Sequence, residues 1–550
     1  MRLFLACAVL VLTGACAADQ PADVVVYGAT WTGDGDRPWA EAVAIRGETI
    51  VAVGDSAAIA PLVGSHTEVL TASGMVVPGF IDDHTHFMSG GFQLASVNLR
   101  DAATPAEFAR RIEAFARTLQ PGEWITGGDW DHELWPGGVL PQRDWIDSLT
   151  PGHPVFVSRL DGHMGLANSL ALELAGVDHN TADTDGGVII RYHGSRQPTG
   201  LLKDNAMDPV WAVIPDASPS QRDSALTRAM RRAAQLGVTT VAEVNGSWAN
   251  RAAVERARAG GHLTVRMALF HSLHDWRAWA DTIARYGTGD DWVRLQGVKG
   301  FVDGSLGSTT AAFDEPYDDE PGTAGTLVIA EDRLRSLLGS ADSAELQLAI
   351  HAIGDRANGL LLDIFDSLQT ERGTRDRRWR IEHAQHLRPA DFDRFARLGV
   401  IAAVQPYHAI DDGRWAEKRI GPERIKTTYA FRSFLDAGVV LAFGSDWTVA
   451  PLSPMLGIYA AVTRRTIDGA NPDGWVPQEK VSVDEALRAY TAASAYGLFM
   501  EERVGRLAPG FAADLVLLDT NLMDVAPETL DRVAVEATVV GGRIVYLAGS

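Results

Sequence analysis

The sequence has few cysteines and a shortage of positive charge. Cys7 and Cys16 are the only cysteines among its 550 residues, so a chain that has lost its first residues contains neither a disulfide bond nor a thiolate metal ligand. Asp and Glu number 71 against 49 Lys and Arg, which gives a formal net charge of −22. This balance argues against nucleic acid or an anionic membrane surface as a partner. A neutral or cationic small molecule is the expected substrate.

Long hydrophobic runs are also lacking after the N-terminus. A single positive charge at Arg2, an apolar run from Leu3 to Leu12 and then small residues form the pattern of an export signal over residues 1–20. The run is too short to span a membrane. Cleavage could follow an A-x-A pattern at residues 15–17, or residues 12–16 could be a bacterial lipobox with Cys16 acylated, which we favour. Either alternative predicts an exported protein, in the periplasm or anchored to the membrane by lipid.

Short β-rich segments separated by Gly and Asp turn signals occupy both ends of the remaining chain. They cover residues 23–27, 42–45 and 49–53 at one end and 513–518, 537–540 and 543–546 at the other. The similar style of the two ends predicts that residues 21–75 and 505–550 form one β-sandwich domain.

Between these ends, apolar strand candidates alternate with segments of helical period, such as residues 219–236 and 333–344. This alternation predicts an α/β fold with a parallel sheet. Eight candidates predict a (β/α)₈ TIM-like barrel within residues 76–504: 76–82, 239–244, 264–270, 295–302, 346–353, 379–382, 400–404 and 439–443. The first gap is too long for one connecting helix, so we expect an inserted lid or subdomain at about residues 90–235.

Two histidines one residue apart end the first barrel strand candidate. Side chains alternate along a strand, so His84 and His86 in FIDDHTHF project to the same side and can converge on one ion. Roughly 0.4 such pairs are expected by chance in a chain of this composition, so the pair alone is a weak motif. Other ligands are needed to support a metal site.

Such ligands occur at the ends of four later strand candidates, where barrel enzymes build their active sites. They are Lys299, His351, His383 and Asp446. Imidazole and carboxylate groups suit Zn²⁺. A lysine ammonium beside cations would be repelled, so Lys299 must be deprotonated, modified or turned away.

Several longer motifs are typical of one family. They are VVPGFIDDHTHF, DGHMGLANSLALELAGV, LGVTTVAEV, VKGFVDGSLGSTTAAF, AIHAIGDRA, RIEHAQH, AFGSDWTVAPLSPM and GRLAPGFAADLVLLD. By these motifs the chain resembles the amidohydrolase superfamily, and within it the YtcJ-like group that includes N-substituted formamide deformylases. The resemblance covers nearly everything after the export signal, and Asp83 stands where Ala is commoner in the superfamily pattern.

The resemblance implies a site for two divalent metal ions, which we expect to be zinc. His84 and His86 with Asp446 would hold one ion, and His351 and His383 the other. Lys299, carbamylated by CO₂, would bridge the ions together with a hydroxide. The implied reaction is hydrolysis of an amide-type C–N bond in an N-acyl or N-formyl compound, with Asp446 as both ligand and proton carrier.

Residues outside the ligand set are candidates for substrate binding. His163 could donate a hydrogen bond to the substrate or its oxyanion, or be a structural residue of the insertion. Trp130, Trp135 and Trp447 could form an apolar or aromatic pocket, or could simply reflect the abundance of Trp, with 15 residues in the chain. The segment from Gln405 to His408, after the seventh strand, could lie at its rim.

Three alternatives to a two-metal amidase remain. A mononuclear ring deaminase typically has a Glu shortly after the fifth-strand histidine, whereas His351 is followed by Ala-Ile-Gly-Asp355. A lactonase or other esterase could use the same hydroxide. A non-catalytic surface binding protein on this scaffold would be expected to have lost ligands, yet all six residues are present.

Overall fold

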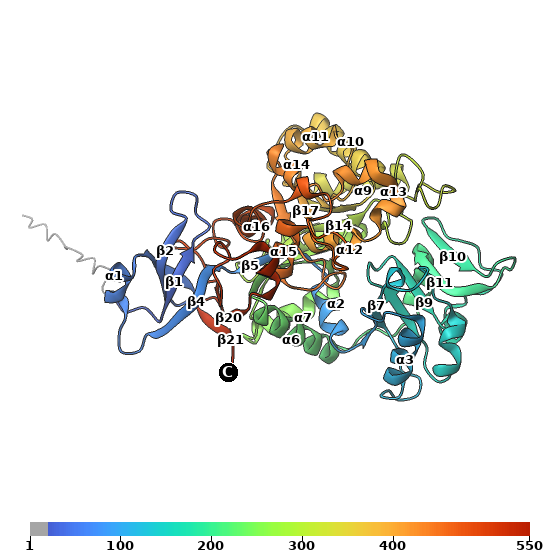
Figure 1. Ribbon diagram of the computed structural model, residues 1–550, viewed down its shortest axis with the longest axis horizontal. Coiled ribbons are helices and arrows are strands. Elements are labelled where there is room, and N and C mark those ends of the chain that lie inside the picture. The colour runs from blue at the N-terminus through green and yellow to red at the C-terminus, as the bar shows by residue number, and fades with distance from the viewer. Residues whose placement is uncertain (1–19, 550) are drawn as a thin grey trace, which may run out of the picture.

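Three sheets organise the part of the chain that the computed structural model describes, residues 20–549. The predicted export signal and Cys16 lie outside these described residues. Figure 1 shows the three parts side by side: the sheet built from both chain ends, the central barrel and the insertion. None of the helices in residues 20–549 is long and apolar enough to cross a membrane.

The central sheet confirms the predicted barrel. Its eight strands are parallel and adjacent in chain order, and a bridge from Thr85 to Trp447 brings the first and last strands together, so the barrel is nearly closed. The strands are β5 (Phe80–Thr85), β12 (Val238–Gly246), β13 (Arg266–Ser272), β14 (Val293–Phe301), β15 (Gln347–Ala352), β16 (Arg380–His383), β17 (Ile401–Val404) and β18 (Leu441–Phe443).

Amphipathic helices cover the barrel strands. A clear case is α6 (Pro219–Gln235), which starts with a capping box between Ser218 and Gln221 and has Pro219 in its first turn. The other principal helices are α2 (Phe87–Gln93), α7 (Trp248–Ala259), α8 (Trp276–Tyr286), α9 (Glu331–Ser343), α10 (Asp355–Arg372), α11 (Asp391–Leu398), α12 (Pro406–Asp412), α13 (Ala416–Arg424), α14 (Phe431–Asp436), α15 (Pro454–Thr463), α16 (Val483–Ala489) and α17 (Ala492–Gly497).

Both chain ends contribute to one seven-stranded sheet. Its order is β21-β20-β19-β4-β1-β2-β3, and β4 joins the two ends by pairing antiparallel with β19. The strands are β1 (Val24–Trp31), β2 (Trp39–Arg46), β3 (Thr49–Gly54), β4 (Glu68–Pro78), β19 (Leu515–Leu518), β20 (Val535–Val540) and β21 (Arg543–Leu547). The composite origin is as expected, and the division into a two-layer sandwich stays a prediction.

The boundary between this sheet and the barrel differs from the predicted one. Residues 76–78 were expected to open the first barrel strand, but they complete β4 in the composite sheet. The chain passes into β5 at Gly79, where a Cβ would lie 2.1 Å from Oγ1 of Thr239. The apolar residues 76–78 were assigned to the barrel because the end of β4 and the start of β5 are both buried and carry similar side chains.

The insertion is a separate small α/β unit. Its sheet has the order β10-β11-β9-β8-β7-β6 and its own hydrophobic clusters. The strands are β6 (Val97–Asn98), β7 (Gly127–Trp130), β8 (Phe156–Arg159), β9 (Met164–Ala167), β10 (Gly187–Arg191) and β11 (Pro198–Asp204), with helices α3 (Pro105–Ala116), α4 (Ser169–Ala175) and α5 (Asp208–Trp211). It ends earlier than the predicted residue 235, because α6 packs on α2 and β12 of the barrel.

Candidate metal centre and active site

A cavity of about 1020 Å³ lies where the carboxyl ends of the barrel strands face the insertion. Five of the six predicted metal ligands line it: His86, Lys299, His351, His383 and Asp446. The sixth, His84, is fully buried behind them. The structure therefore brings together all six residues, which we call the ligand cluster.

Asp446 is the centre of the ligand cluster. Its Oδ1 lies 3.5 Å from Nε2 of His84 and 3.1 Å from Nε2 of His86. Ligand atoms of His84, His383 and Asp446 all lie within 4.8 Å of one another. His383 and Asp446 have positive φ angles of 72° and 55°, a strained conformation that is concentrated at functional sites.

Three histidines of the cluster each use one ring nitrogen for a protein contact. Nδ1 of His84 contacts Oε2 of Glu382. Nδ1 of His383 lies 2.7 Å from Oε1 of Gln405, and Nε2 of His351 lies 3.0 Å from the carbonyl oxygen of Gly304. Metal-binding histidines usually donate their second ring N–H in this way, which leaves the other nitrogen for an ion.

Lys299 lies beside His84 with its amine in an unusual environment. Nζ is 3.4 Å from Nε2 of His84 and 4.6 Å from the centre of the Phe301 ring. Burial lowers the pKa of this amine to about 8. At neutral pH, a much larger fraction of this amine is therefore deprotonated than in an exposed lysine.

The protonation states suit metal binding. Burial lowers the pKa of His84 to about 4, with Lys299 adding to the effect, and it lowers the pKa of His383 well below its usual value. Burial alone would raise the pKa of Asp446, but His84, His86 and His383 hold it well below the usual range. Neutral imidazoles around an ionised carboxylate are the forms that bind a metal ion.

One buried atom tests whether the cluster fits a divalent ion. Oδ1 of Asp446 is buried and accepts no well-aligned hydrogen bond. A buried carboxylate oxygen without a well-aligned donor is costly unless a cation neutralises it. With imidazole and carboxylate donors around it, the cluster fits a divalent ion such as Zn²⁺.

Sequence reasoning missed the support behind His84. Arg380 donates to Oε1 of Glu382 (2.7 Å) and to Oδ1 of Asp83 (2.8 Å), and all three side chains are fully buried. Glu382 in turn contacts His84. The only sequence signal was the alternating charged residues in RIEH together with an Asp where the superfamily pattern has Ala, and neither shows which groups become partners.

The structure places most of the predicted substrate contacts outside the cavity lining. Trp130 is buried in the core of the insertion, where Nε1 donates to the carbonyl oxygen of Val157 (2.9 Å) and the ring stacks on Trp135. Trp447 is 5% exposed and its Nε1 donates to Gln93 (2.9 Å). Gln405 holds His383 and is 1% exposed. Trp130, Trp135, Trp447 and Gln405 therefore do not line the cavity, whereas His408, in the same predicted rim segment as Gln405, does.

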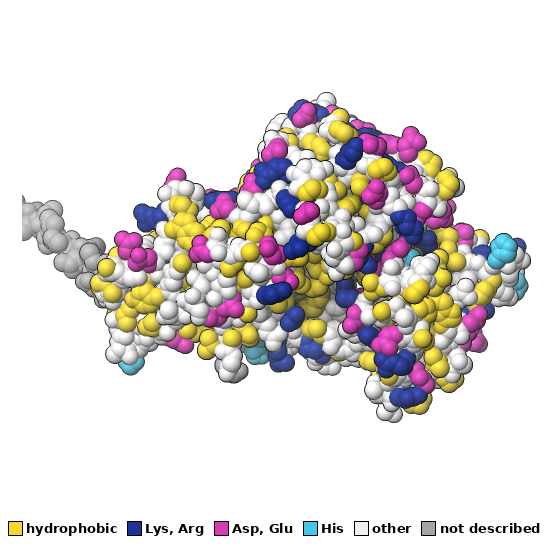
Figure 2. Space-filling view, in the orientation of Figure 1, with side chains coloured by type: hydrophobic (Ala, Val, Ile, Leu, Met, Phe, Trp, Pro, Cys, Tyr) yellow, Lys and Arg dark blue, Asp and Glu magenta, His cyan; other side chains and the backbone are white. Residues whose placement is uncertain are grey.

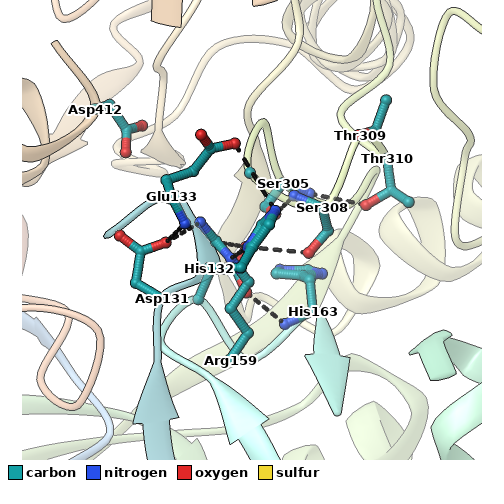
Figure 3. A network of polar contacts seen from close by, with 12 residues as sticks. Asp131, His132, Glu133, Arg159, His163, Ser305, Ser308, Thr309, Thr310 and Asp412 are labelled. Carbon is teal, nitrogen blue, oxygen red and sulfur yellow. Dashed lines mark hydrogen bonds and ion pairs between the residues drawn. The ribbon is translucent and has the colours of Figure 1, made fainter. Parts of the chain in front are cut away.

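A buried polar network fixes the insertion against the barrel (Figure 3). Arg159 donates to Asp131 (3.0 Å) and Asp161 (2.6 Å) within the insertion. Asp161 then accepts from Ser305 (2.5 Å) and Ser308 (3.1 Å), which follow β14 of the barrel. The insertion is therefore a fixed wall of the cavity, and it contributes His163 to the lining.

Comparison with known proteins gives the family. The model of the amidohydrolase family (Amidohydro_3) matches residues 72–546, which include the barrel, the insertion and the later strands of the composite sheet, from the middle of β4 to β21. The chain belongs to the amidohydrolase family. It is thus an enzyme that hydrolyses C–N bonds other than peptide bonds, and its family implies a divalent metal ion.

Named relatives cover almost the whole chain. It is 40% identical to Protein LONG AFTER FAR-RED 3 of Arabidopsis thaliana (95% of this chain, 91% of the relative). It is 31% identical to YtcJ of Bacillus subtilis, described as an amidohydrolase (93% and 97%), and 29% identical to the N-substituted formamide deformylase of Arthrobacter pascens (94% and 96%). This confirms the resemblance to the YtcJ-like amidohydrolases.

A solved structure agrees with the fold. The uncharacterized metal-dependent hydrolase from Pyrococcus horikoshii superposes with a TM-score of 0.74 at 27% identity, covering 92% of this chain and 99% of that chain.

Proposed function

We propose that this amidohydrolase cleaves the amide-type C–N bond of an N-acyl or N-formyl compound and releases an amine. The observation that carries the proposal is the ligand cluster at the mouth of the barrel, centred on Asp446. The formamide deformylase among the relatives supports this substrate class.

The cluster has enough donors for two divalent ions, expected to be zinc. His84, His86 and Asp446 would hold one ion, and His351 and His383 the other. When bound, such ions polarise a carbonyl group and lower the pKa of water. The second ring nitrogens of His84, His351 and His383, which are not used for the supporting contacts described above, support this assignment.

Lys299 is proposed to be carbamylated. Its neutral amine would attack CO₂ to form an N–C bond and lose one proton, which yields a carbamate with one negative charge. Burial favours the neutral amine that this reaction needs. The product would replace an unfavourable ammonium beside the ions with an anionic oxygen ligand.

Asp446 is proposed to carry the proton during hydrolysis. Its carboxylate would accept a proton from the attacking water and deliver it to the nitrogen of the departing amine. Its buried Oδ1, with no well-aligned hydrogen bond, is consistent with this role. His163, in the opposing wall, would donate a hydrogen bond to the substrate.

The charges around the cavity favour a neutral or cationic substrate. The lining contains one lysine, Lys299, and one arginine, Arg159. It contains seven aspartates: Asp129, Asp161, Asp204, Asp208, Asp411, Asp412 and Asp446. On the face of the molecule shown in Figure 2, acidic and basic side chains are interspersed and no broad basic patch that would suit a nucleic acid is visible.

We further propose export to the periplasm or to a membrane-anchored state through Cys16. Fractionation of cells that produce the full chain or a Cys16→Ser variant tests this. Loss of membrane association in the variant supports the lipid anchor, and equal association rejects it.

A screen for amine release tests the function. The purified protein, with its metal content measured, is incubated with N-formyl and N-acyl amines, with lactones and esters, and with amino-substituted ring compounds. Release of a substituted amine from the first group supports the proposal. Ammonia from the rings with one ion per chain would instead indicate a deaminase, and turnover of lactones or esters alone an esterase.

A further inference from the structure

His163 and Asp204 meet at the end of two paired strands of the insertion. Strand β11 runs antiparallel to β9 with Lys203 opposite Met164, so Asp204 and His163 follow as neighbours. The backbone N–H of Asp204 donates to the carbonyl oxygen of His163 (3.1 Å). Oδ1 of Asp204 lies 2.7 Å from Nδ1 of His163. Backbone and side chains thus both hold the pair together.

The backbone of Asp204 is strained. Its φ of 47° and ψ of −128° belong to a region that residues with a side chain rarely occupy. Such a conformation persists only where the surrounding structure enforces it, and it is concentrated at functional sites.

The carboxylate of Asp204 also lies against the loop that supports the ligand cluster. A Cβ on Gly304 would be 3.0 Å from Oδ1 of Asp204, and the carbonyl oxygen of Gly304 contacts Nε2 of His351. The side chain of Asp204 is 2% exposed and that of His163 is 16% exposed. The pair is therefore held by the paired strands of the insertion and by the loop at Gly304, and His163 is its more exposed member.

The imidazole of His163 presents one nitrogen to the cavity. Nδ1 contacts Asp204, and within residues 20–549 Nε2 makes no hydrogen bond. The ring lines the cavity, and its centre is 5.2 Å from that of His351. A polar atom without a protein partner in such a wall is available to a ligand. A carboxylate that accepts from Nδ1–H fixes the ring orientation and stabilises the imidazolium form, as in other His–Asp pairs. In this form Nε2 also carries a hydrogen and can donate.

We propose that Asp204 is a positioning residue that holds the imidazole of His163 so that Nε2 donates a hydrogen bond to the carbonyl oxygen of the substrate. The proposal rests on the proposed function, in which that carbonyl belongs to an amide beside the ligand cluster. His163 is then a catalytic residue that contacts the substrate, and Asp204 acts through it.

A set of near-isosteric variants tests this arrangement. Asp204→Asn removes the charge at Nδ1 and keeps the shape. His163→Asn keeps a donor close to Asp204 but removes the nitrogen that faces the cavity. The double variant combines both changes. Asp178→Asn is the matched control, because Asp178 and His179 form an exposed pair at 4.0 Å on the same insertion. Bound metal and thermal unfolding are measured for every variant.

Hydrolysis of the amide found in the screen provides the first measurement. We expect kcat to fall about 10²–10³-fold in His163→Asn and at least about 10-fold in Asp204→Asn, with KM changed less and the metal retained. The double variant should be no slower than His163→Asn, because residues that act as a unit are not additive. The inference would be overturned if the fold-loss of kcat in the double variant equalled the product of the losses in the two single variants. It would also be overturned if kcat of Asp204→Asn were within twofold of the parent.

A binding measurement separates this inference from the proposed function. Acetohydroxamate, a small carbonyl compound, is titrated into the metal-loaded full-length protein by calorimetry. We expect about 10-fold weaker binding in His163→Asn and in Asp204→Asn and unchanged binding in Asp178→Asn. If no amide is hydrolysed but this pattern appears, the proposed function fails and the positioning role stands. Equal affinity in all four proteins rejects the positioning role, whatever the activity.

Discussion

The carboxylate of Glu382 contacts Nδ1 of His84, and Nε2 of the same ring faces Asp446 and Lys299. Arg380 holds Glu382 in place from behind with two hydrogen bonds of 2.7 and 3.0 Å. The orientation of His84 is thus fixed by buried groups that never reach the cavity.

Glu382→Gln should weaken metal binding while leaving the fold intact. The amide keeps the size of the side chain but leaves Arg380 with less negative charge and His84 with a weaker partner. Loss of such a supporting group typically costs about 10–100-fold in metal affinity. Competition with a chromogenic chelator measures the affinity. Glu501→Gln, which alters an ion pair to Arg378 outside the cavity, should leave it unchanged, and equal affinities in both variants would contradict the role of Glu382.

Lys299→Ala should reduce the metal content from about two ions per chain to about one and remove most activity. The reason is that the proposed carbamate supplies the oxygen ligand shared by both ions. Metal analysis after gel filtration gives the stoichiometry. Mass spectrometry under native conditions in bicarbonate should show a mass increase of one carbamate in the parent alone. Full activity of the variant with one ion would favour a mononuclear site.

Gly79→Ala should destabilise the protein, because its Cβ would meet Oγ1 of Thr239 at 2.1 Å and the atoms around it are buried. Overpacking of this kind costs about 1–3 kcal/mol in the free energy of unfolding. Gly54→Ala is the control, since no atom lies within 4 Å of a Cβ at that position. Thermal unfolding compares the two variants, and equal melting temperatures would refute the close approach at Gly79.

Asp446→Asn should separate metal binding from proton transfer. The amide keeps a coordinating oxygen but cannot accept a proton, so kcat should fall by about 10²–10⁴-fold while much of the metal is retained. An amide with a good leaving group needs little protonation and should suffer less than an ordinary amide. If Asp446→Asn hydrolysed both amides with kcat values close to those of the parent, another residue would have to carry the proton.

The barrel could be predicted from the sequence because its strands are continuous apolar runs separated by helical patterns. All eight predicted strands overlap β5, β12 to β18. The ligand cluster could also be predicted, because the carboxyl ends of barrel strands converge. Its residues lie at or near the ends of five of the eight strands: His84, Lys299, His351, His383 and Asp446.

The remaining features depend on contacts between distant parts of the chain. Trp130 was expected in a pocket, but a buried indole that finds a backbone acceptor such as Val157 is equally stable in a core. Glu382 and Asp83 acquire their roles only through Arg380, and Asp204 only because β11 pairs with β9. Such pairings have no periodicity that a single sequence reveals.

Amine release as a function of bound metal tests the central claim most directly. The protein is stripped with a chelator, returned to buffer with bicarbonate and titrated with Zn²⁺, and amine release from the best amide of the screen is followed at each point. We predict no turnover in the stripped protein and a rise that reaches its plateau at about two ions per chain. Amine release that persists without metal, or that is unaffected by added Zn²⁺, would contradict a metal-dependent amidohydrolase site at Asp446.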